Sequence, residues 1–183
     1  MLVNSEPRIT VRDCTIRNNH ATHEGGGIWA GNVACTLENL LITNNSSSDE
    51  GGGFQGVLLN PDCEMIRCTV ADNDANFGSA IFLTENTLLG IESCILAFNN
   101  GSSAFSTRVF SGIEIGCTDV FGHAQGNQLP SNTTDLGGNL EIDPLFCDRT
   151  NYLLRTDSPC LSGNHPDGTD CGVIGARGAG CSP

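Results

Sequence analysis

The stretches HEGGGIWAGN (residues 23–32) and DEGGGFQGVL (residues 49–58) lie 26 residues apart. In both, an acidic residue precedes three glycines and one large apolar residue. Glycine is costly to order and has no side chain to pack, so a triplet that recurs at a fixed step indicates a backbone bend needed once per structural unit. We therefore expect a chain built from repeats.

Apolar residues form columns when the chain is aligned on these glycines. Five columns are predicted, the first with steps of 26, 28, 26 and 26 residues. They are Ile9, Cys35, Cys63, Leu89, Ile115; Val11, Leu37, Met65, Ile91, Cys117; Cys14, Leu40, Cys68, Cys94, Val120; Ile16, Ile42, Val70, Leu96; and Leu2, Ile28, Phe54, Ile81, Phe105. Apolar residues two apart in short runs are typical of strands with one buried face, and no run is long enough for a helix.

Three short strands per repeat cannot bury their own apolar side, but stacked repeats can, each strand pairing in parallel with its equivalent in the next repeat. The columns predict an all-β fold, a right-handed single-stranded parallel β-helix, or solenoid, of about five coils of about 26 residues. A β-sandwich predicts regular turn signals but no such columns. We expect one continuous domain, with coils over residues 1–125 and the last coil and an irregular, disulfide-containing C-terminal cap over 126–183.

A polar column follows the third strand of each repeat. Its members are Asn19, Asn45, Asn73 and Asn99, with Gln125 at the next step. Stacked side-chain amides can hydrogen-bond from coil to coil, so this column predicts an asparagine ladder at a corner.

The last glycine of each triplet occupies another column, just before the inward residue of the first strand. Gly27 and Gly53 are followed there by Ala80 and Ala104. A larger side chain is expected to collide with the turning backbone. The loop between the ladder and this column varies in length, which makes these loops the expected contact surface.

The charge of the chain limits its partners. Its formal net charge is -13, and its eight basic residues are all arginine. Nucleic acids and anionic membranes both require a positive surface, so neither is an expected partner. No stretch is apolar and long enough to cross a bilayer, and no membrane insertion is expected. Ten cysteines suit an oxidising environment, which predicts an extracellular or cell-surface location and a mature piece of a longer secreted protein.

The repeats "CTIRNN...EGGGI" and "LLITNN...EGGGF" resemble those of secreted bacterial right-handed β-helix proteins of the pectate-lyase-like superfamily, and also the GGAI and FxxN motifs of chlamydial polymorphic membrane proteins. The resemblance covers residues 1 to about 125, and the cysteine-containing tail resembles the closing module of such proteins. Because the superfamily includes polysaccharide lyases, glycosidases, epimerases, adhesins and surface filaments, the resemblance implies the fold rather than one activity.

The cysteines fall into two groups. Cys35 with Cys63, and Cys68 with Cys94, occupy adjacent rungs, which are about 4.8 Å apart, whereas the Cβ atoms of a relaxed disulfide are about 3.8 Å apart. Packed core thiols are therefore favoured over strained disulfides for these pairs.

The other group lies in the irregular tail: Cys147, Cys160, Cys171 and Cys181. Two disulfides are expected among these four, and the pairing is left open.

Candidate binding residues lie beside the first two glycine corners and on the same loop face. They are His20, His23, Asp49, Glu50 and Asp72. Aligned carboxylates are also able to bind Ca²⁺, the one cofactor considered. If the protein is an enzyme, Glu24, Glu50 and Asp74 are the candidate acid and base pair for glycoside cleavage; otherwise these acids form a solvated face.

Two function classes are open. The favoured hypothesis is an extracellular or cell-surface structural or binding module, adhesin-like, that binds a glycan or a protein or forms a fibre, with no catalysis. The alternative is a carbohydrate-active enzyme, a lyase or glycoside hydrolase.

The first coil is expected to have an open strand edge with the apolar tops of Leu2, Ile9, Val11 and Cys14 exposed. Preceding coils or a neighbouring subunit are expected to cover it, because an open edge is a template for other strands.

Overall fold

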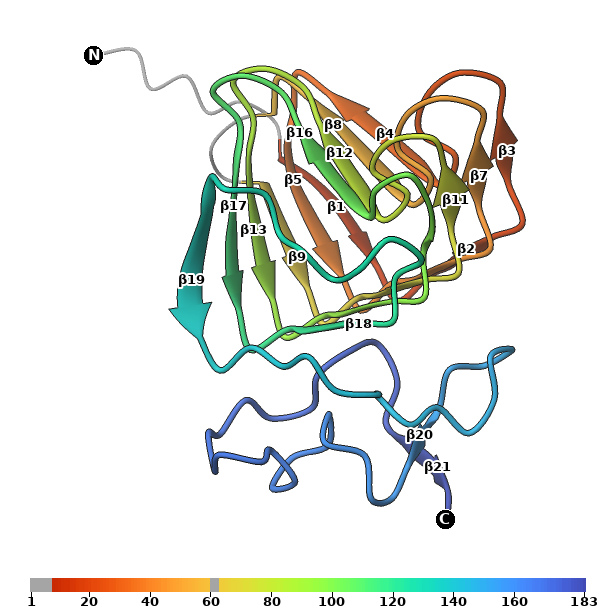
Figure 1. The fold of residues 1–183 in the computed structure, drawn as a ribbon, viewed down its shortest axis with the longest axis vertical. Helices are drawn as coiled ribbons and strands as arrows, with labels where there is room; N and C mark the ends of the chain where they lie inside the picture. Colours follow the sequence, from red (N-terminus) through yellow and green to blue (C-terminus); the bar gives the residue numbers. More distant parts are fainter. Residues whose placement is uncertain (1–7, 60–62) are drawn as a thin grey trace.

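The computed structural model describes residues 8–59 and 63–183, and every regular element in that part of the chain is a β-strand. The strands stack in parallel as a solenoid (Figure 1). Each complete coil passes through four sheets in turn, which we name A, B, C and D.

The sheets contain equivalent strands of successive coils. Sheet A consists of β1 (Arg8–Arg12), β5 (Ala34–Glu38), β9 (Cys63–Ile66), β13 (Leu88–Glu92), β17 (Gly112–Gly116) and β19 (Thr133–Gly137). Sheet B consists of β2 (Thr15–Arg17), β6 (Leu41–Thr43), β10 (Thr69–Ala71), β14 (Ile95–Ala97) and β18 (Asp119–Phe121). Sheet C consists of β3 (His20–Ala21), β7 (Ser46–Ser47), β11 (Asp74–Ala75) and β15 (Asn100–Gly101). Sheet D consists of β4 (Ile28–Gly31), β8 (Phe54–Val57), β12 (Ile81–Leu83) and β16 (Phe105–Thr107).

The predicted solenoid is confirmed, with two differences in its parts. Sheet A has six strands, one more than the five coils predicted, because β19 adds a rung beyond residue 125. Each coil also has a fourth strand, in sheet C, that the sequence pattern did not reveal. A strand of two mostly polar residues carries no apolar alternation by which it could be recognised.

The register confirms the apolar columns in the first four coils and corrects the fifth. Leu89 pairs with Ile113, 24 residues later, so Ile115 stands below Ile91 rather than below Leu89. By the same shift Val120 pairs with Leu96 instead of following Cys94. The cause is the loop before Ala104, which is two residues shorter than its predecessor, so this coil has 24 residues instead of 26.

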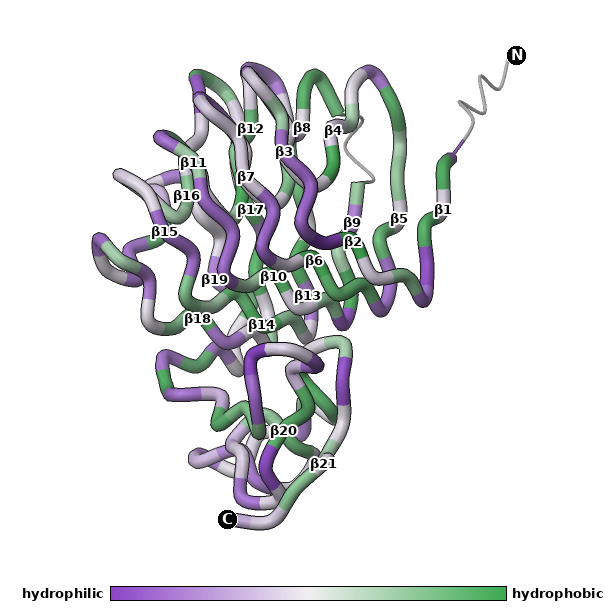
Figure 2. Tube along the Cα trace, turned by 90° about the vertical axis from the view of Figure 1, so that its right-hand side faces the viewer, coloured by the Kyte–Doolittle hydropathy of each residue, from purple (hydrophilic) through white to green (hydrophobic). Residues whose placement is uncertain are grey.

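The inward columns pack into one continuous apolar core that runs through the coils. Leu40, Phe54, Met65, Ile81 and Leu96 have no measurable exposure. Figure 2 shows the polar residues gathered on the loops around this core. The predicted Leu2 lies outside the described residues.

The corners of the coil require left-handed backbone. The residue after each sheet A strand and the residue before each ladder position have positive φ: Asp13, Asn39, Arg67, Ser93, Cys117, Asn18, Asn44, Asp72 and Phe98. Asparagine and aspartate tolerate this conformation better than most residues, which explains their abundance in the repeats.

The glycine column behaves as predicted. A Cβ placed on Gly27 would lie 2.5 Å from the carbonyl oxygen of Gly53, and one on Gly53 would lie 2.7 Å from Val70 Cγ1. Both distances are too short for carbon to occupy. Gly51, the first glycine of its triplet, has a φ of +68°, so it supplies the bend itself.

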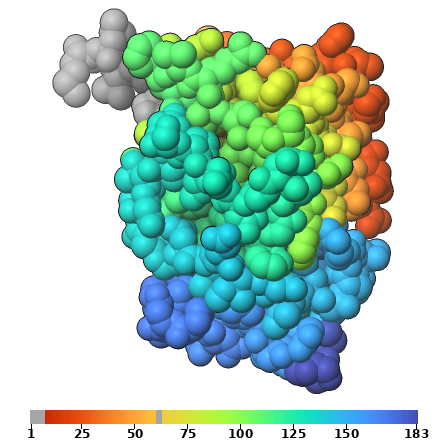
Figure 3. All heavy atoms as spheres, viewed as in Figure 1, coloured from red at the N-terminus to blue at the C-terminus, as the bar shows by residue number. Residues whose placement is uncertain are grey.

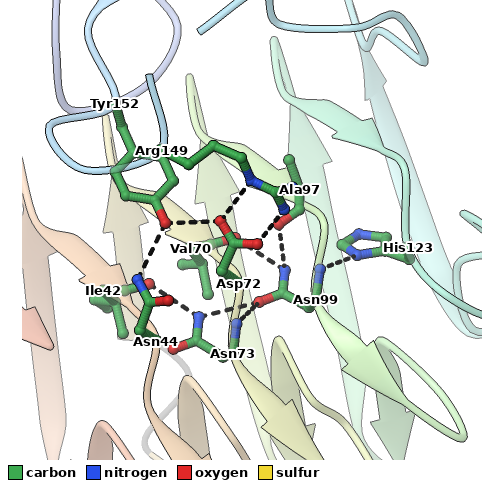
Figure 4. Close-up of polar contacts among 10 residues, drawn as sticks. All are labelled: Ile42, Asn44, Val70, Asp72, Asn73, Ala97, Asn99, His123, Arg149 and Tyr152. Carbon is green, nitrogen blue, oxygen red and sulfur yellow. Dashed lines mark hydrogen bonds and ion pairs between the residues drawn. The ribbon is translucent and has the colours of Figure 1, made fainter. Parts of the chain in front are cut away.

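The asparagine ladder is confirmed and continues into the C-terminal half through a histidine (Figure 4). The Oδ1 atoms of Asn73 and Asn99 each accept hydrogen bonds of 2.9 to 3.0 Å from the backbone N–H and side-chain amide of the preceding rung. Asn45 Oδ1 accepts the corresponding pair from Asn19.

Gln125, predicted for the fifth rung, is exposed. His123 Nδ1 accepts the N–H of Asn99 instead, at 3.1 Å and 24 residues on, as the shortened coil requires. Burial lowers the pKa of His123 to about 4, so the ring is neutral at neutral pH.

Two cysteine predictions are wrong. Cys35 and Cys63 form a disulfide between adjacent rungs, where packed thiols were expected. Their Cα atoms are 4.6 Å apart, within the range that disulfides adopt, so a small shift of the Cβ atoms from the ladder spacing is sufficient. Cys68 and Cys94 remain free and buried, as predicted.

In the tail, Cys147 pairs with Cys181, but Cys171 pairs with Cys117 of the solenoid, and Cys160 is free and buried. Cys117 was counted as a core residue because the two-residue shift was missed. It lies instead at a corner next to the C-terminal segment.

The C-terminal segment, residues 138–183, packs along the outer face of sheet B and does not simply close the last coil (Figures 1 and 3). Ile95 and Ala97 of the sheet pack against Leu154 and Ile174 of the segment. The segment contains one small sheet, β20 (Leu154–Arg155) paired with β21 (Ala179–Cys181).

The first described coil is the most open. Ile9 is 53 % exposed, Cys14 is exposed and Val11 is half-buried, as the prediction of an open edge requires. A covering by preceding coils or by a neighbouring subunit stays a prediction, which size-exclusion chromatography with light scattering can test.

Candidate binding surface

Two predicted acids meet on the loop edge before sheet D. Glu24 and Glu50 form a parallel bridge, and Phe77 occupies the third rung of the same column. Asp74 lies apart from them, on β11 of sheet C, where it pairs with Ser46 and Asn100. The three candidate catalytic acids therefore do not converge on one point.

The other predicted residues of the loop face have local partners. His20 Nδ1 lies 2.9 Å from Ser46 Oγ, and the carbonyl oxygen of His23 accepts Ser47 Oγ at 2.6 Å. The backbone of Asp49 accepts the N–H of Phe77 at 3.0 Å. These side chains are on the exposed edge and do not form a common pocket.

Asp72, also predicted to bind a ligand, serves the fold. Its carboxylate forms an ion pair with Arg149 and accepts a hydrogen bond of 2.7 Å from the Tyr152 hydroxyl (Figure 4). Arg149 also stacks on the Phe98 ring, 4.2 Å from its centroid. These contacts attach the C-terminal segment to the solenoid.

An unpredicted column lies on the outer face of sheet D, beside Glu24 and Glu50. The inward residues of this sheet belong to the core, so the next residue of each strand points outward: Trp29, Gln55, Phe82 and Ser106. Such a sequence of indole, amide and phenyl groups at successive rungs is unusual on a surface that is otherwise polar.

Trp29 is 52 % exposed. A Cβ placed on Gly31 would lie within 3.0 Å of three atoms of its six-membered ring, so the indole lies flat over that glycine. Gly25 leaves room for its Cβ on the other side. One face of the ring therefore rests on backbone, and the opposite face is open.

Gln55 is fully buried, and neither its Nε2 nor its Oε1 has a hydrogen-bond partner in the described chain. A buried unpaired amide costs about 1 to 3 kcal/mol, so its position next to the exposed indole calls for a functional explanation.

Arg108 spans the same column from the end of β16. Its guanidinium lies 5.5 Å from the centroid of the Phe82 ring and 2.5 Å from Glu50 Oε1. The hydrogen bond to Glu50 raises the pKa of Arg108. We call Glu24, Trp29, Glu50, Phe77 and Arg108, with Gln55 beneath them, the aromatic rim.

Part of the aromatic rim was detectable in the sequence. Trp29, the only tryptophan, directly follows the inward Ile28, so the strand alternation already places it outside. Nothing in the sequence indicates that Arg108 reaches back 58 residues to Glu50.

A second surface lies on the outer face of sheet A. A cleft of about 290 Å³ is lined by Glu64, Glu92 and Glu114, with Gly90 at its floor and Leu136 at its side. Glu64 and Glu114 both pair with Gly90, from opposite sides, so their Cα atoms are two rungs apart, about 9.6 Å.

No metal centre or membrane-spanning helix is found. Within residues 8–59 and 63–183, no group of three or more histidine, cysteine, aspartate or glutamate residues could hold a metal ion. Asp167 Oδ1 accepts bonds from Thr169 and is part of a turn. No helix in this part of the chain is long and apolar enough to cross a membrane.

Comparison with known proteins gives one match. Residues 13–31 match the model of the Chlamydia polymorphic membrane protein repeat. They include the first ladder asparagine and the first glycine triplet. Comparisons with curated proteins and with solved structures find no significant match.

Proposed function

We propose that this protein is a rigid extracellular or cell-surface binding module whose aromatic rim recognises a glycan. The observation that carries the proposal is the flat, half-exposed Trp29 beside the unpaired amide of Gln55. An aromatic face packs against the C–H face of a sugar ring, and a few fixed polar groups at its edge supply orientation.

The polar groups of the aromatic rim suit a neutral saccharide. Gln55 offers both a donor and an acceptor, and the carboxylate of Glu24 accepts hydrogen bonds from hydroxyl groups. The net charge of -13 opposes a polyanionic ligand near these acids. Three disulfides suit an oxidising compartment, and the matched repeat is named for a membrane protein, which both support display outside the cytoplasm.

The lone tryptophan provides a direct test. Neutral oligosaccharides selected on a glycan array are titrated into the protein while the emission of Trp29 is recorded. We expect a saturable change in emission, since a stacked sugar removes water from the open face of the indole. Trp29→Ala, followed by calorimetry, should weaken binding at least about tenfold.

Phe110→Ala is the matched control, because Phe110 is 84 % exposed and lies outside the aromatic rim. It should bind like the wild type. Array binding that survives Trp29→Ala, or the absence of any glycan ligand, would contradict the proposal.

The cleft on sheet A supports a second candidate function, glycoside cleavage by Glu64 and Glu114. The two side chains can approach the separation of about 6.5 to 9.5 Å used by inverting enzymes. Reducing-sugar release that Glu64→Gln and Glu114→Gln both abolish would establish it. Activity unaffected by these changes would exclude this cleft.

A further inference from the structure

A cleft of about 480 Å³ lies where the C-terminal segment meets the first described coil, away from the aromatic rim. β2 contributes Thr15 and Arg17 to its wall, and the C-terminal segment contributes Thr150, Asn151 and Arg177. Arg177 Nη2 lies 3.4 Å from Thr15 Oγ1, so the two walls touch at one point.

The charge in this cleft is opposite to that of the molecule. The residues that line it include two arginines and no acid. In the described chain, Arg67, Arg108, Arg149 and Arg155 each have a carboxylate partner. Neither Arg17 nor Arg177 has a carboxylate within salt-bridge distance there. Two unpaired guanidinium groups thus share one concave site on a protein of net charge -13.

We infer that this cleft is an anion-binding site that takes a small ligand carrying an oxyanion group. A guanidinium presents paired N–H donors that match sulfate, phosphate or carboxylate oxygens, and an anion between Arg17 and Arg177 relieves their mutual repulsion. The hydroxyl groups of Thr15 and Thr150 and the Asn151 amide supply further donors. This inference does not depend on the proposed glycan function.

The size of the cleft indicates more than a bare ion. Its volume is in the range of sites for small organic molecules, about 300 to 1,000 Å³. Leu41 and Leu153 also line it and offer apolar contact. The oxyanion is therefore expected as a substituent, such as the sulfate ester of a saccharide, and a free inorganic anion should bind more weakly.

The experiment compares four folded proteins: the wild type, Arg17→Gln, Arg177→Gln and Arg12→Gln. Arg12 is an exposed arginine of the same coil that does not line the cleft, which makes it the matched control. Binding of sodium sulfate, and of a sulfated disaccharide against its unsulfated form, is measured by calorimetry. Thermal unfolding is followed in sulfate and in chloride of equal ionic strength.

The wild type and Arg12→Gln should bind the sulfated disaccharide and unfold at a higher temperature in its presence. Each cleft variant should bind about tenfold more weakly or worse, as expected for the loss of a charge-assisted hydrogen bond. Binding of inorganic sulfate alone would also support the site and identify a free anion as its ligand. Equal responses from all four proteins, or no binding by any, would overturn the inference.

Discussion

Tyr152 of the C-terminal segment donates a hydrogen bond of 2.7 Å to Asp72 of the solenoid, 80 residues earlier in the chain. The same carboxylate pairs with Arg149, and Asn44 donates to the Tyr152 hydroxyl at 3.2 Å. Burial, together with the bond to Asp72, raises the pKa of Tyr152. The hydroxyl therefore stays a donor throughout the ordinary pH range.

Tyr152→Phe tests this attachment. It keeps the ring packed against Phe146 but removes the bond to a charged acceptor, so the free energy of unfolding should fall by about 1.5 to 3 kcal/mol. Amide hydrogen exchange should speed up in residues 138–183 and little in the coils. Uniform exchange across the chain would show that the segment and solenoid unfold together whatever this bond does.

Asn73→Ala tests the ladder at its centre. Asn73 is fully buried, and its Oδ1 accepts both donors of Asn45. Truncation leaves those donors without partners and should lower the free energy of unfolding by about 3 kcal/mol. Asn19→Ala is the control, since Asn19 is exposed and accepts nothing from another rung; its cost should stay below about 1 kcal/mol. Equal losses would mean that the ladder is not the source of stability.

Leu40→Asp tests the core. Leu40 has no measurable exposure and is packed among inward residues of neighbouring coils. An aspartate there buries a charge without a partner, and the solenoid should not fold. Circular dichroism of the variant should lack the cooperative thermal transition of the wild type. An unchanged melting temperature would show that Leu40 does not face the core.

Asp119 predicts an unusual pH dependence. It is fully buried between β18 and the C-terminal segment, and desolvation raises its pKa to about 7. The remaining contacts are the N–H of Ile142 and the Cys160 thiol, with Asp143 and Glu141 near by.

The folded-state pKa lies above the unfolded value, so this group stabilises the fold at low pH and loses that contribution as the pH rises from about 4 to about 7. The loss is at most about 4 kcal/mol. Asp119→Asn mimics the neutral acid, so it should match the wild type near pH 4 and be more stable at pH 8. Denaturant unfolding at both pH values measures this. A variant no more stable at pH 8 would contradict the expected burial of the charge.

The free cysteines should differ in reactivity. Cys14 is exposed, whereas Cys68, Cys94 and Cys160 are buried, and burial raises the pKa of the Cys94 and Cys160 thiols. A maleimide reagent should label one thiol in the native protein and four after unfolding without reduction. Mass spectrometry counts the labels. More than one label in the native state would place a second thiol at the surface.

The features predicted from sequence are those that repeat. A position such as Phe54 is apolar in every coil because every coil needs it, and Asn73 recurs because each rung bonds the next. The disulfide from Cys117 to Cys171 occurs once, between parts of the chain 54 residues apart, and no spacing rule encodes it. The site follows the same division: Glu24 and Glu50 were found by their alignment, whereas Arg108 and Arg177 act across unrelated segments.

The C-terminal segment has a consequence for how this protein can change its length. It is attached to the last coil through Cys171 and reaches the first described coil through Arg177. Most solenoids gain or lose repeats freely, since each repeat contacts only its neighbours. Here an inserted coil would separate the two attachment points by a further rung, about 4.8 Å. The segment thus acts as a ruler, and a duplication of one repeat would survive only if the ruler lengthened with it.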